Sequence, residues 1–165
     1  MILIKKPEDM EQYFDEKSST YNLFSYSDIF GELPTVHFEC DIAVTSNILA
    51  PVIYAGACNI KCGDLTCYDI AAHSIRCRNL IANSGSILAY DIYADNIIAD
   101  FDITACRIRA ESIQASEILA KEIRYYSVCC AEHDLKCESI FPQWDTSKHF
   151  SLRGDVIINW KREDK

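Results

Sequence analysis

Large aliphatic residues recur at every fifth position through the middle of the chain, and Ala or Cys follows most of them two places later. Residues two apart point to the same side of an extended strand, and the residue between them points to the other side. A strict spacing of five would drift around the surface of a helix. The pattern therefore predicts short strands joined by regular corners. The aliphatic positions are Ile60, Leu65, Ile70, Ile75, Leu80, Ile87, Ile92, Ile97, Ile103, Ile108, Ile113, Ile118, Ile123, Val128, Leu135 and Ile140.

The residue before each aliphatic position is usually Asp, Asn or Ser, which suits a corner because these side chains bond to nearby backbone. Four units per coil would close a square, right-handed parallel β-helix. The repeat then supplies about four coils and the looser start about one more. Residues about 20 apart would stack. We therefore expect Ile98 over Leu119, and Tyr68 over Leu88 or Tyr90. The five-residue spacing is interrupted at three places, and these phase skips predict loops or bulges at corners. They lie at Leu80→Ile87, Ile97→Ile103 and Val128→Leu135.

Three segments follow from this pattern: an N-terminal cap over 1–40, the repeat over 41–140, and a C-terminal cap and tail over 141–165. In the first we expect a strand at Ile2–Ile4 and a helix beginning near Pro7, because Pro favours the first turn of a helix. In the last, residues 149–160 predict a β-hairpin that turns at Gly154-Asp155. Caps are expected because open β-helix ends expose unpaired strand edges.

Composition narrows the class of protein further. Of the 165 residues, 49% are hydrophobic, yet no uninterrupted apolar run reaches the length of a membrane span. The N-terminus places apolar residues before charges, unlike a secretory signal, so a cytoplasmic location is expected. The net charge is −9, and residues 1–41 alone carry −6. This charge disfavours direct nucleic-acid binding and favours a protein partner with a basic surface, although it could serve solubility alone.

The nine cysteines predict neither a metal site nor disulfides. Five take the place of Ala in the repeat, where free Cys acts as a small buried hydrophobe. Cys129 and Cys130 are adjacent, so at most one of them should face the core. An odd number of cysteines without a secretion signal indicates reduced thiols. The five repeat cysteines are Cys62, Cys67, Cys77, Cys130 and Cys137.

No motif for catalysis is present in the sequence. The four histidines are scattered, and there is no glycine-rich phosphate loop and no His-Glu-x-x-His zinc motif. Cys106 or Cys129 could be an exposed thiol, but a packing or surface role is favoured. We therefore expect no catalytic, cofactor-binding or metal-binding residues.

Outward positions of the repeat supply the candidate partner-binding residues. Polar residues are expected there, so exposed apolar residues indicate an interface, either between two copies or with another protein. The alternative is that the N-terminal segment folds back and covers them. The candidates are the acids Asp95, Asp100, Glu111 and Glu117 and the apolar residues Tyr90, Tyr93, Ile98 and Leu119.

The polar–aliphatic pairs Asp64-Leu65, Asp69-Ile70 and Asp91-Ile92 resemble the unit of pentapeptide-repeat proteins. In this chain the small residue follows the aliphatic one by two places instead of preceding it. The closer likeness is to uncharacterised bacterial and phage proteins built from Asp-Ile-x-Ala-x units, and it covers about 100 residues.

The pentapeptide-repeat resemblance implies a non-catalytic, acidic β-helical binding protein, because several members of that family are acidic rods that imitate DNA. The implied function is a phage or mobile-element inhibitor that competes with nucleic acid for the basic groove of a topoisomerase or CRISPR effector. We expect a homodimer. The alternative is a self-assembling scaffold similar to the bactofilins.

Overall fold

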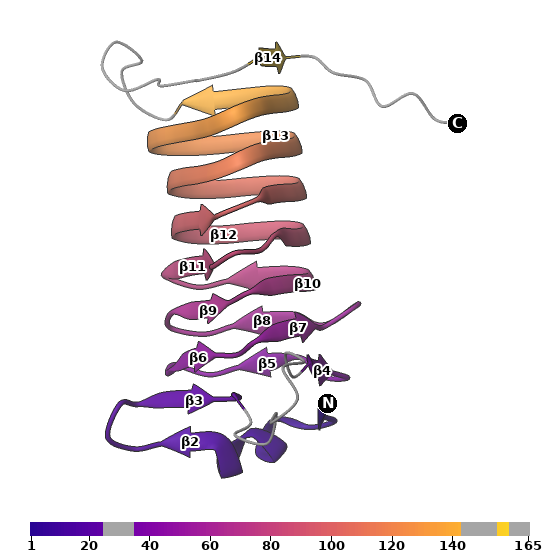
Figure 1. Cartoon of the computed structure of the whole chain (residues 1–165), viewed down its shortest axis with the longest axis vertical. Helices are drawn as coiled ribbons and strands as arrows, with labels where there is room; N and C mark the ends of the chain where they lie inside the picture. Colours follow the sequence, from indigo (N-terminus) through magenta and orange to yellow (C-terminus); the bar gives the residue numbers. More distant parts are fainter. Residues whose placement is uncertain (25–34, 143–154, 159–165) are drawn as a thin grey trace.

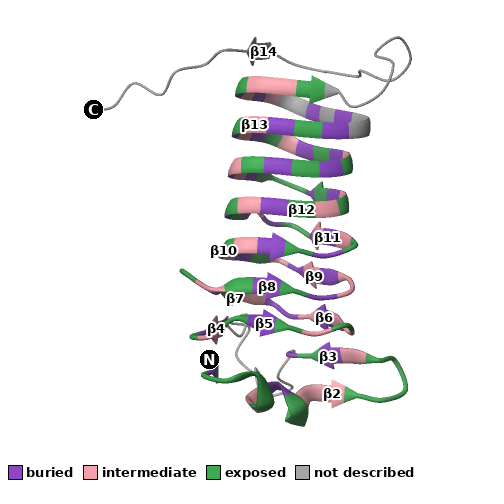
Figure 2. Cartoon of the chain, turned by 180° about the vertical axis from the view of Figure 1, so that it is seen from behind, coloured by how far each residue is buried: buried purple, intermediate pink, exposed green. Residues whose placement is uncertain are grey.

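The computed structural model describes residues 1–24, 35–142 and 155–158, without the side chains of 126–128, 130, 132–133, 142 and 155–158. The regular structure of the described residues is nearly all β, with one helix, and it winds into a parallel β-solenoid of about six turns (Figure 1). The predicted parallel β-helix is therefore confirmed. Along the coils, buried and exposed residues alternate, as expected for strands with one face inside the rod (Figure 2).

Strand pairing defines three sides of the rod, which we call faces A, B and C. Each later coil passes through A, B and C in turn and pairs in parallel with the coil before it. Face A contains β1 (Ile2–Ile4), β4 (Thr35–Phe38), β7 (Val52–Tyr54) and the starts of β10 (Asp69–Arg76) and β12 (Ile87–Ala99). Face B contains β5 (Ile42–Ala43), β8 (Asn59–Lys61), the end of β10 and the middle of β12. Face C contains β3 (Thr20–Asn22), β6 (Asn47–Leu49), β9 (Leu65–Cys67), β11 (Asn79–Ala82) and the end of β12.

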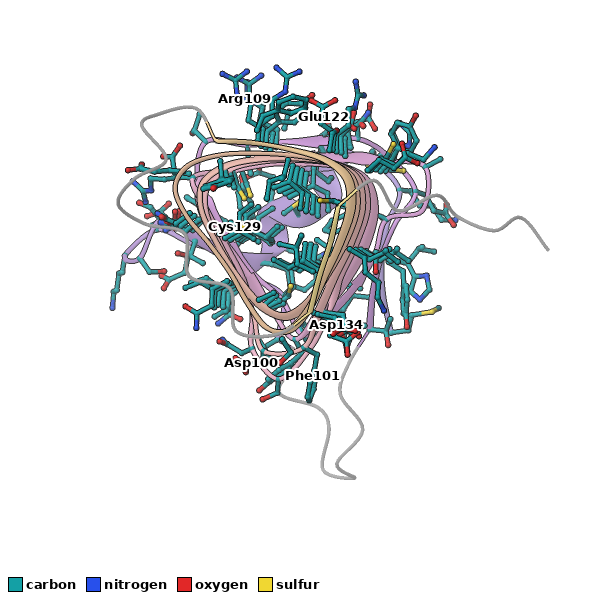
Figure 3. All side chains as sticks on the ribbon, turned by 90° about the horizontal axis from the view of Figure 1, so that it is seen from above. Asp100, Phe101, Arg109, Glu122, Cys129 and Asp134 are labelled. Atoms are coloured by element: carbon teal, nitrogen blue, oxygen red, sulfur yellow. The ribbon has the colours of Figure 1, made fainter. Side chains whose placement is uncertain are left out.

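Each coil has three sides, so the prediction of a square coil is wrong. Ile70 pairs with Ile87, and Ile87 pairs with Ile103, which gives a coil of 17 and then 16 residues instead of 20. Viewed along its axis, the rod is triangular (Figure 3). A spacing of five fixes the length of a side, but the corner angles decide how many sides close the coil. One large aliphatic residue and one small residue per side fill this narrow interior at the density that protein cores require.

The interior is made of stacked columns, one pair for each face. The repeat residues there are almost fully buried, including Ile75, Ile92 and Ile97, each 0% exposed. Burying such a side chain contributes about 1.5–3 kcal/mol, and close packing of neighbouring coils makes the columns continuous. The large inward residues are Ile2, Val36, Ile53, Ile70, Ile87 and Ile103 on face A, Ile42, Ile60, Ile75, Ile92 and Ile108 on face B, and Tyr21, Ile48, Leu65, Leu80, Ile97 and Ile113 on face C.

Two of the three phase skips fall at one corner, between faces C and A. Residues 83–86 form a turn between β11 and β12, and residues 100–101 form a bend before β13 (Asp102–Pro142). Asp100 and Phe101 project from this corner (Figure 3). The sequence prediction of loops at corners is confirmed for these two skips. At the third, Val128→Leu135, the strand β13 continues and no loop forms.

A ladder of polar side chains follows the corner between faces B and C. Asn79 donates to Asp64 at 2.8 Å, Asn96 donates to Asn79 at 2.8 Å, and Ser112 donates to Asn96 at 2.6 Å. The amide of Asp64 donates to the Asn47 side chain at 2.9 Å, which extends the ladder to a further coil. These bonds satisfy polar groups that a corner takes out of the strand pairing.

The N-terminal segment covers one end of the rod. A 3-10 helix, η1 (Pro7–Tyr13), buries Met10 completely, and β2 (Phe14–Asp15) pairs antiparallel with β3. The Asp9 carboxylate accepts the backbone N–H groups of Lys5 and Lys6, which caps the start of the helix. The predicted strand and the helix beginning at Pro7 are confirmed, although the helix is 3-10.

The other end does not carry the predicted hairpin in the described residues. β14 (Asp155–Ile158) pairs in parallel with Asp134–Cys137 of β13, so it adds another layer to face A. The first arm of the predicted hairpin lies in residues 143–154, outside the described part of the chain. Alternating apolar residues suit either pairing, so local sequence could not decide between them.

Candidate interaction surfaces

The interior of the rod offers little to ligands. Within the described side chains, no polar or charged residue is buried. Across the same part of the chain, no group of three His, Cys, Asp or Glu residues could hold a metal ion. Side chains that could contact a partner therefore lie on the outer faces. None of the described helices is long and apolar enough to span a membrane.

The interior thiols are suited to packing and not to reactivity. Burial raises the pKa of Cys67 to about 12, and a hydrogen bond with Cys62, together with burial, raises the pKa of Cys77. Cys129 is 0% exposed and lies inside the triangle (Figure 3). Cys129 therefore has the packing role that the sequence favoured and is not an exposed thiol. The sequence predicts Cys130 as the inward residue, but Cys129, one place earlier, takes the inward position. The reason is that the five-residue spacing changes after Tyr125, which is itself buried.

Face A presents an apolar column to solvent. Strand pairing places Leu3, His37, Tyr54, Ala71, Leu88 and Thr104 on successive coils. Leu88 is 54% exposed and Tyr54 is 49% exposed, and the rings of His37 and Tyr54 lie 5.3 Å apart. Leu119 follows the buried Ile118 as Thr104 follows the buried Ile103, so Leu119 takes the corresponding outward position on the next coil of face A.

Face B presents a column of cations and aromatic rings. Strand pairing stacks Lys61, Arg76, Tyr93 and Arg109 on four successive coils. Further along the same face, Arg124 lies over the ring of Phe141, with its guanidinium carbon 5.6 Å from the ring centroid. Figure 3 shows Arg109 projecting from the side of the triangle opposite the Asp100 corner. One face of a strongly acidic protein is thus cationic.

Face C has an aliphatic centre and acidic edges. Its outward column places Leu49, Thr66, Ile81, Ile98 and Gln114 on successive coils. The edge shared with face B carries Asp95 and, on the next coil, Glu111. The amide of Asp95 donates to the carbonyl of Arg78 on the preceding coil. The edge shared with face A carries Asp69, Asp100, Asp102 and Glu117.

The structure distributes the eight predicted partner-binding residues over all three faces. Five of them gather at face C: Asp95 and Glu111 on one edge, Asp100 and Glu117 on the other, and Ile98 between them. The other three separate. Tyr93 lies on face B, Leu119 on face A, and Tyr90 at the edge between A and B.

The predicted stacking pairs are wrong because the coil is shorter than 20 residues. Ile98 lies beside Ile81 and Gln114 and not beside Leu119. Leu88 lies beside Ala71 and Thr104. The stacked aromatic pair is instead His73 and Tyr90, with ring centroids 5.3 Å apart and planes 5° from parallel.

The cationic column of face B was missed in the sequence. Its signal is a basic residue directly after the aliphatic residue of every third unit, with one aromatic replacement: Lys61, Arg76, Tyr93, Arg109 and Arg124. A four-unit coil scatters these residues over different faces, and a three-unit coil gathers them on one. The number of units per coil was the missing information.

The predicted alternative, in which the N-terminal segment folds back over the outward apolar residues, is supported within residues 1–24 at Tyr68, whose ring lies 5.9 Å from that of Phe24. Residues 1–24 otherwise lie at the end of the rod (Figure 1). Leu88, Tyr90 and Ile98 remain exposed.

The fold and its surfaces define a capped β-solenoid with three chemically distinct faces. Comparison of the chain with protein-family models, curated proteins and solved structures finds no match.

Proposed function

We propose that the protein is a non-catalytic binding protein whose face C enters a basic groove of a nucleic-acid-processing enzyme and competes there with DNA or RNA. The observation that supports this most strongly is the pair of acidic edges on face C. Asp95 and Glu111 follow one edge on successive coils, and Asp100 and Glu117 follow the other. A groove that binds nucleic acid is lined by Lys and Arg, so its charge complements these edges.

The local density of acids is comparable with that of a nucleic acid. Two consecutive coils, about 9.6 Å of rod axis, hold five edge carboxylates, which is about one per 2 Å. Duplex DNA carries about one charge per 1.7 Å of its axis. This similarity in charge density to DNA covers a short length of the rod. One coil earlier, the edge that carries Asp95 holds Arg78, a cation that forms a salt bridge with Asp64. The five carboxylates belong to Asp95, Asp100, Asp102, Glu111 and Glu117.

The aliphatic centre of face C adds a contact that a nucleic acid would not make. Ile81 and Ile98 lie side by side, and Ile98 is 39% exposed. Apolar residues at the centre of a charged patch are typical of protein interfaces, where the central contacts lose water and the rim stays hydrated. Face C therefore fits a protein groove with basic walls and an apolar floor.

The proposal is tested by displacement of labelled DNA or guide-bound target from a type II topoisomerase and a Cas9-type effector. We expect the protein to release the nucleic acid from at least one of them. Changing Asp95→Asn, Asp100→Asn, Glu111→Gln and Glu117→Gln together should weaken release by about tenfold or more, since each close charge pair at an interface contributes on the order of 1 kcal/mol. Asn at position 100 retains an acceptor for the Ser84 amide, which the Asp100 carboxylate now caps.

The control removes four acids from the N-terminal cap: Glu8→Gln, Glu11→Gln, Asp15→Asn and Glu16→Gln. Both variants lose the same net charge, so general electrostatic attraction would weaken both equally. Equal weakening, or no release by the unaltered protein from either class of enzyme, would contradict the proposal.

We also propose that two copies associate through face A. Its exposed column runs along several coils and is apolar at Leu3, Tyr54 and Leu88. Sedimentation should show a dimer, and Leu88→Glu with Tyr54→Glu should give a monomer. End-to-end polymers, as in the scaffold alternative, would contradict this arrangement. The cap formed by η1, β2 and β3 opposes such polymers at the N-terminal end.

A further inference from the structure

We infer that face B is a second binding surface, separate from face C, and that it binds an acidic amphipathic helix of a partner protein. The surface consists of the column Lys61, Arg76, Tyr93, Arg109, Arg124 and Phe141. Its charge is opposite to that of the protein as a whole. The inference goes beyond the proposed competition with nucleic acid and does not depend on it.

The column is regular because strand pairing fixes it. Lys61 pairs with Arg76, Arg76 with Tyr93, and Tyr93 with Arg109, one residue per coil. Neighbouring parallel strands lie about 4.8 Å apart, so the side chains form a row with that spacing. Their positions are fixed by rigid backbone, which lowers the entropy that a partner must offset on binding.

Part of the positive charge in the column is not matched within the protein. The salt bridges of the described residues engage Arg78, Arg107, Arg124 and Lys136, and they do not involve Lys61 or Arg76. Both Lys61 and Arg76 are exposed and occupy neighbouring coils. A partner carboxylate placed between them would contact two cations at once.

The spacing favours a helix as the partner. Residues on one face of an α-helix recur at about 5.4 Å per turn, which is close to the 4.8 Å step of the column. Over four coils the mismatch is about 2 Å, which flexible Lys and Arg side chains can absorb. Carboxylates at one position per turn can therefore meet Lys61, Arg76 and Arg109 in succession.

The aromatic positions complement the other residues of such a helix. Tyr93 takes the third place in the column and is 37% exposed, and Phe141 is 47% exposed beyond Arg124. Leu or Met side chains of an amphipathic helix would pack on these rings. The combination of Arg and aromatic residues is typical of the residues that contribute most to binding at protein interfaces.

Acids beside the column disfavour a nucleic acid on the same face. Asp91 pairs with Arg107, and Glu122 pairs with Arg124. Glu111 follows the adjoining edge. A continuous phosphate backbone laid along face B would meet these carboxylates as well as the cations, whereas a helix can place neutral residues opposite them.

The experiment uses three labelled probes with the full-length protein. The first is a helical peptide of about 20 residues with one Glu per turn along a single stripe and Leu beside the stripe. The second has the same composition with its Glu residues spread around the helix. The third is a single-stranded oligonucleotide of similar length. Binding is measured by fluorescence polarisation at about 50 mM and about 200 mM salt.

We expect the striped peptide to bind about tenfold or more tightly than the other two probes, and more weakly at high salt. Changing Lys61→Gln, Arg76→Gln and Arg109→Gln should reduce its affinity by about tenfold or more. The matched control, Lys5→Gln, Lys6→Gln and Lys17→Gln, makes the same change in net charge at the N-terminal cap and should alter affinity by less than about twofold.

Circular dichroism of both variants serves as the folding control, and both should keep the strand content of the unaltered protein. Equal binding of the striped and spread peptides, an equal effect of the two triple variants, or no binding of the striped peptide would each overturn the inference. Tighter binding of the oligonucleotide would also overturn it and would identify face B as a nucleic-acid surface. Because face C is unaltered in these variants, the competition experiment reports separately on the proposed function.

Discussion

The inside and the outside of this rod follow different rules, although they alternate residue by residue along the same strands. Inside, all three sides repeat nearly the same pair, an aliphatic residue followed by Ala or Cys. Outside, the sides differ: face A is apolar, face B carries a cationic column, and face C has acidic edges. The fold and the binding surfaces are therefore specified by separate sets of positions, and one set can change without the other.

Neighbouring residues on face C test this separation most directly. Ile97 is 0% exposed and Ile98 is 39% exposed, and both belong to β12. Ile97→Ala should lower the free energy of unfolding by about 2–5 kcal/mol, because it leaves a cavity in a close-packed column. Ile98→Ala should lower it by less than about 1 kcal/mol. Urea unfolding followed by circular dichroism measures both.

In binding, the substitution at Ile98 should have the larger effect and the substitution at Ile97 the smaller one. Ile98→Ala removes a contact at the centre of face C and should weaken the displacement of nucleic acid, whereas Ile97→Ala should not do so in the molecules that remain folded. Similar losses of stability in the two variants would mean that inside and outside are not independent.

The sequence could predict the interior but not the surfaces, and the reason lies in the geometry of a coil. A spacing of five and strand alternation were sufficient to identify Ile75, Ile92 and Ile97 as inward residues. Neither feature depends on how many units make a coil. The outward neighbours of a residue do depend on it, because an error of one unit moves every neighbour to another face. For this reason the sequence predicts Ile98 beside Leu119 and does not place Arg76 and Arg109 in one column.

The acids of face C could be predicted even though the predicted number of units per coil was wrong. Asp95 and Asp100 occupy outward positions of their five-residue units, and an outward position depends on the unit and not on the number of units in a coil. Their arrangement along two edges required the register. Similarly, the parallel pairing of β14 is a long-range choice that the local pattern of residues 155–158 could not determine.

Substitutions at a corner test whether the interior and the surface are also independent of each other in the turns. A Cβ atom added at Gly85 would lie 1.9 Å from the carbonyl oxygen of Tyr68, which no backbone can accept without moving. Gly85→Ala should therefore lower the free energy of unfolding by about 1–3 kcal/mol, the usual cost of overpacking. Thermal unfolding monitored by circular dichroism measures the effect.

Ser84 provides the matched control at the adjacent position. Its φ of +57° is a conformation that glycine adopts more easily than serine. Ser84→Gly should therefore change the free energy of unfolding by less than about 1 kcal/mol, because relief of backbone strain offsets the greater freedom of glycine in the unfolded chain. If Gly85→Ala were equally mild, the coil of Tyr68 would be free to shift, and the corner would not be fixed by close packing.

The smallest predicted effect concerns an ion pair at the corner between faces B and C. Hydrogen bonds from the Arg78 guanidinium, and also from Asn79, lower the pKa of Asp64 below its ordinary value. A lowered folded-state pKa means that the pair stabilises the fold above the unfolded pKa of about 3.9. That stabilisation is lost as the pH falls through the folded-state pKa. Arg78 is 62% exposed at its side chain, so water screens the pair and its contribution should stay below about 1 kcal/mol.

Urea unfolding at about pH 7 and about pH 3 tests this sign. The unaltered protein should lose more stability on acidification than Asp64→Asn, which keeps the side-chain shape but has no carboxylate to protonate. Arg78→Gln should reduce the same loss, and combining the two changes should add little, because both remove one interaction. Equal acid sensitivity in all four proteins would show that the polar ladder, which links Asp64 to Asn79 and Asn96, holds this corner without help from charge.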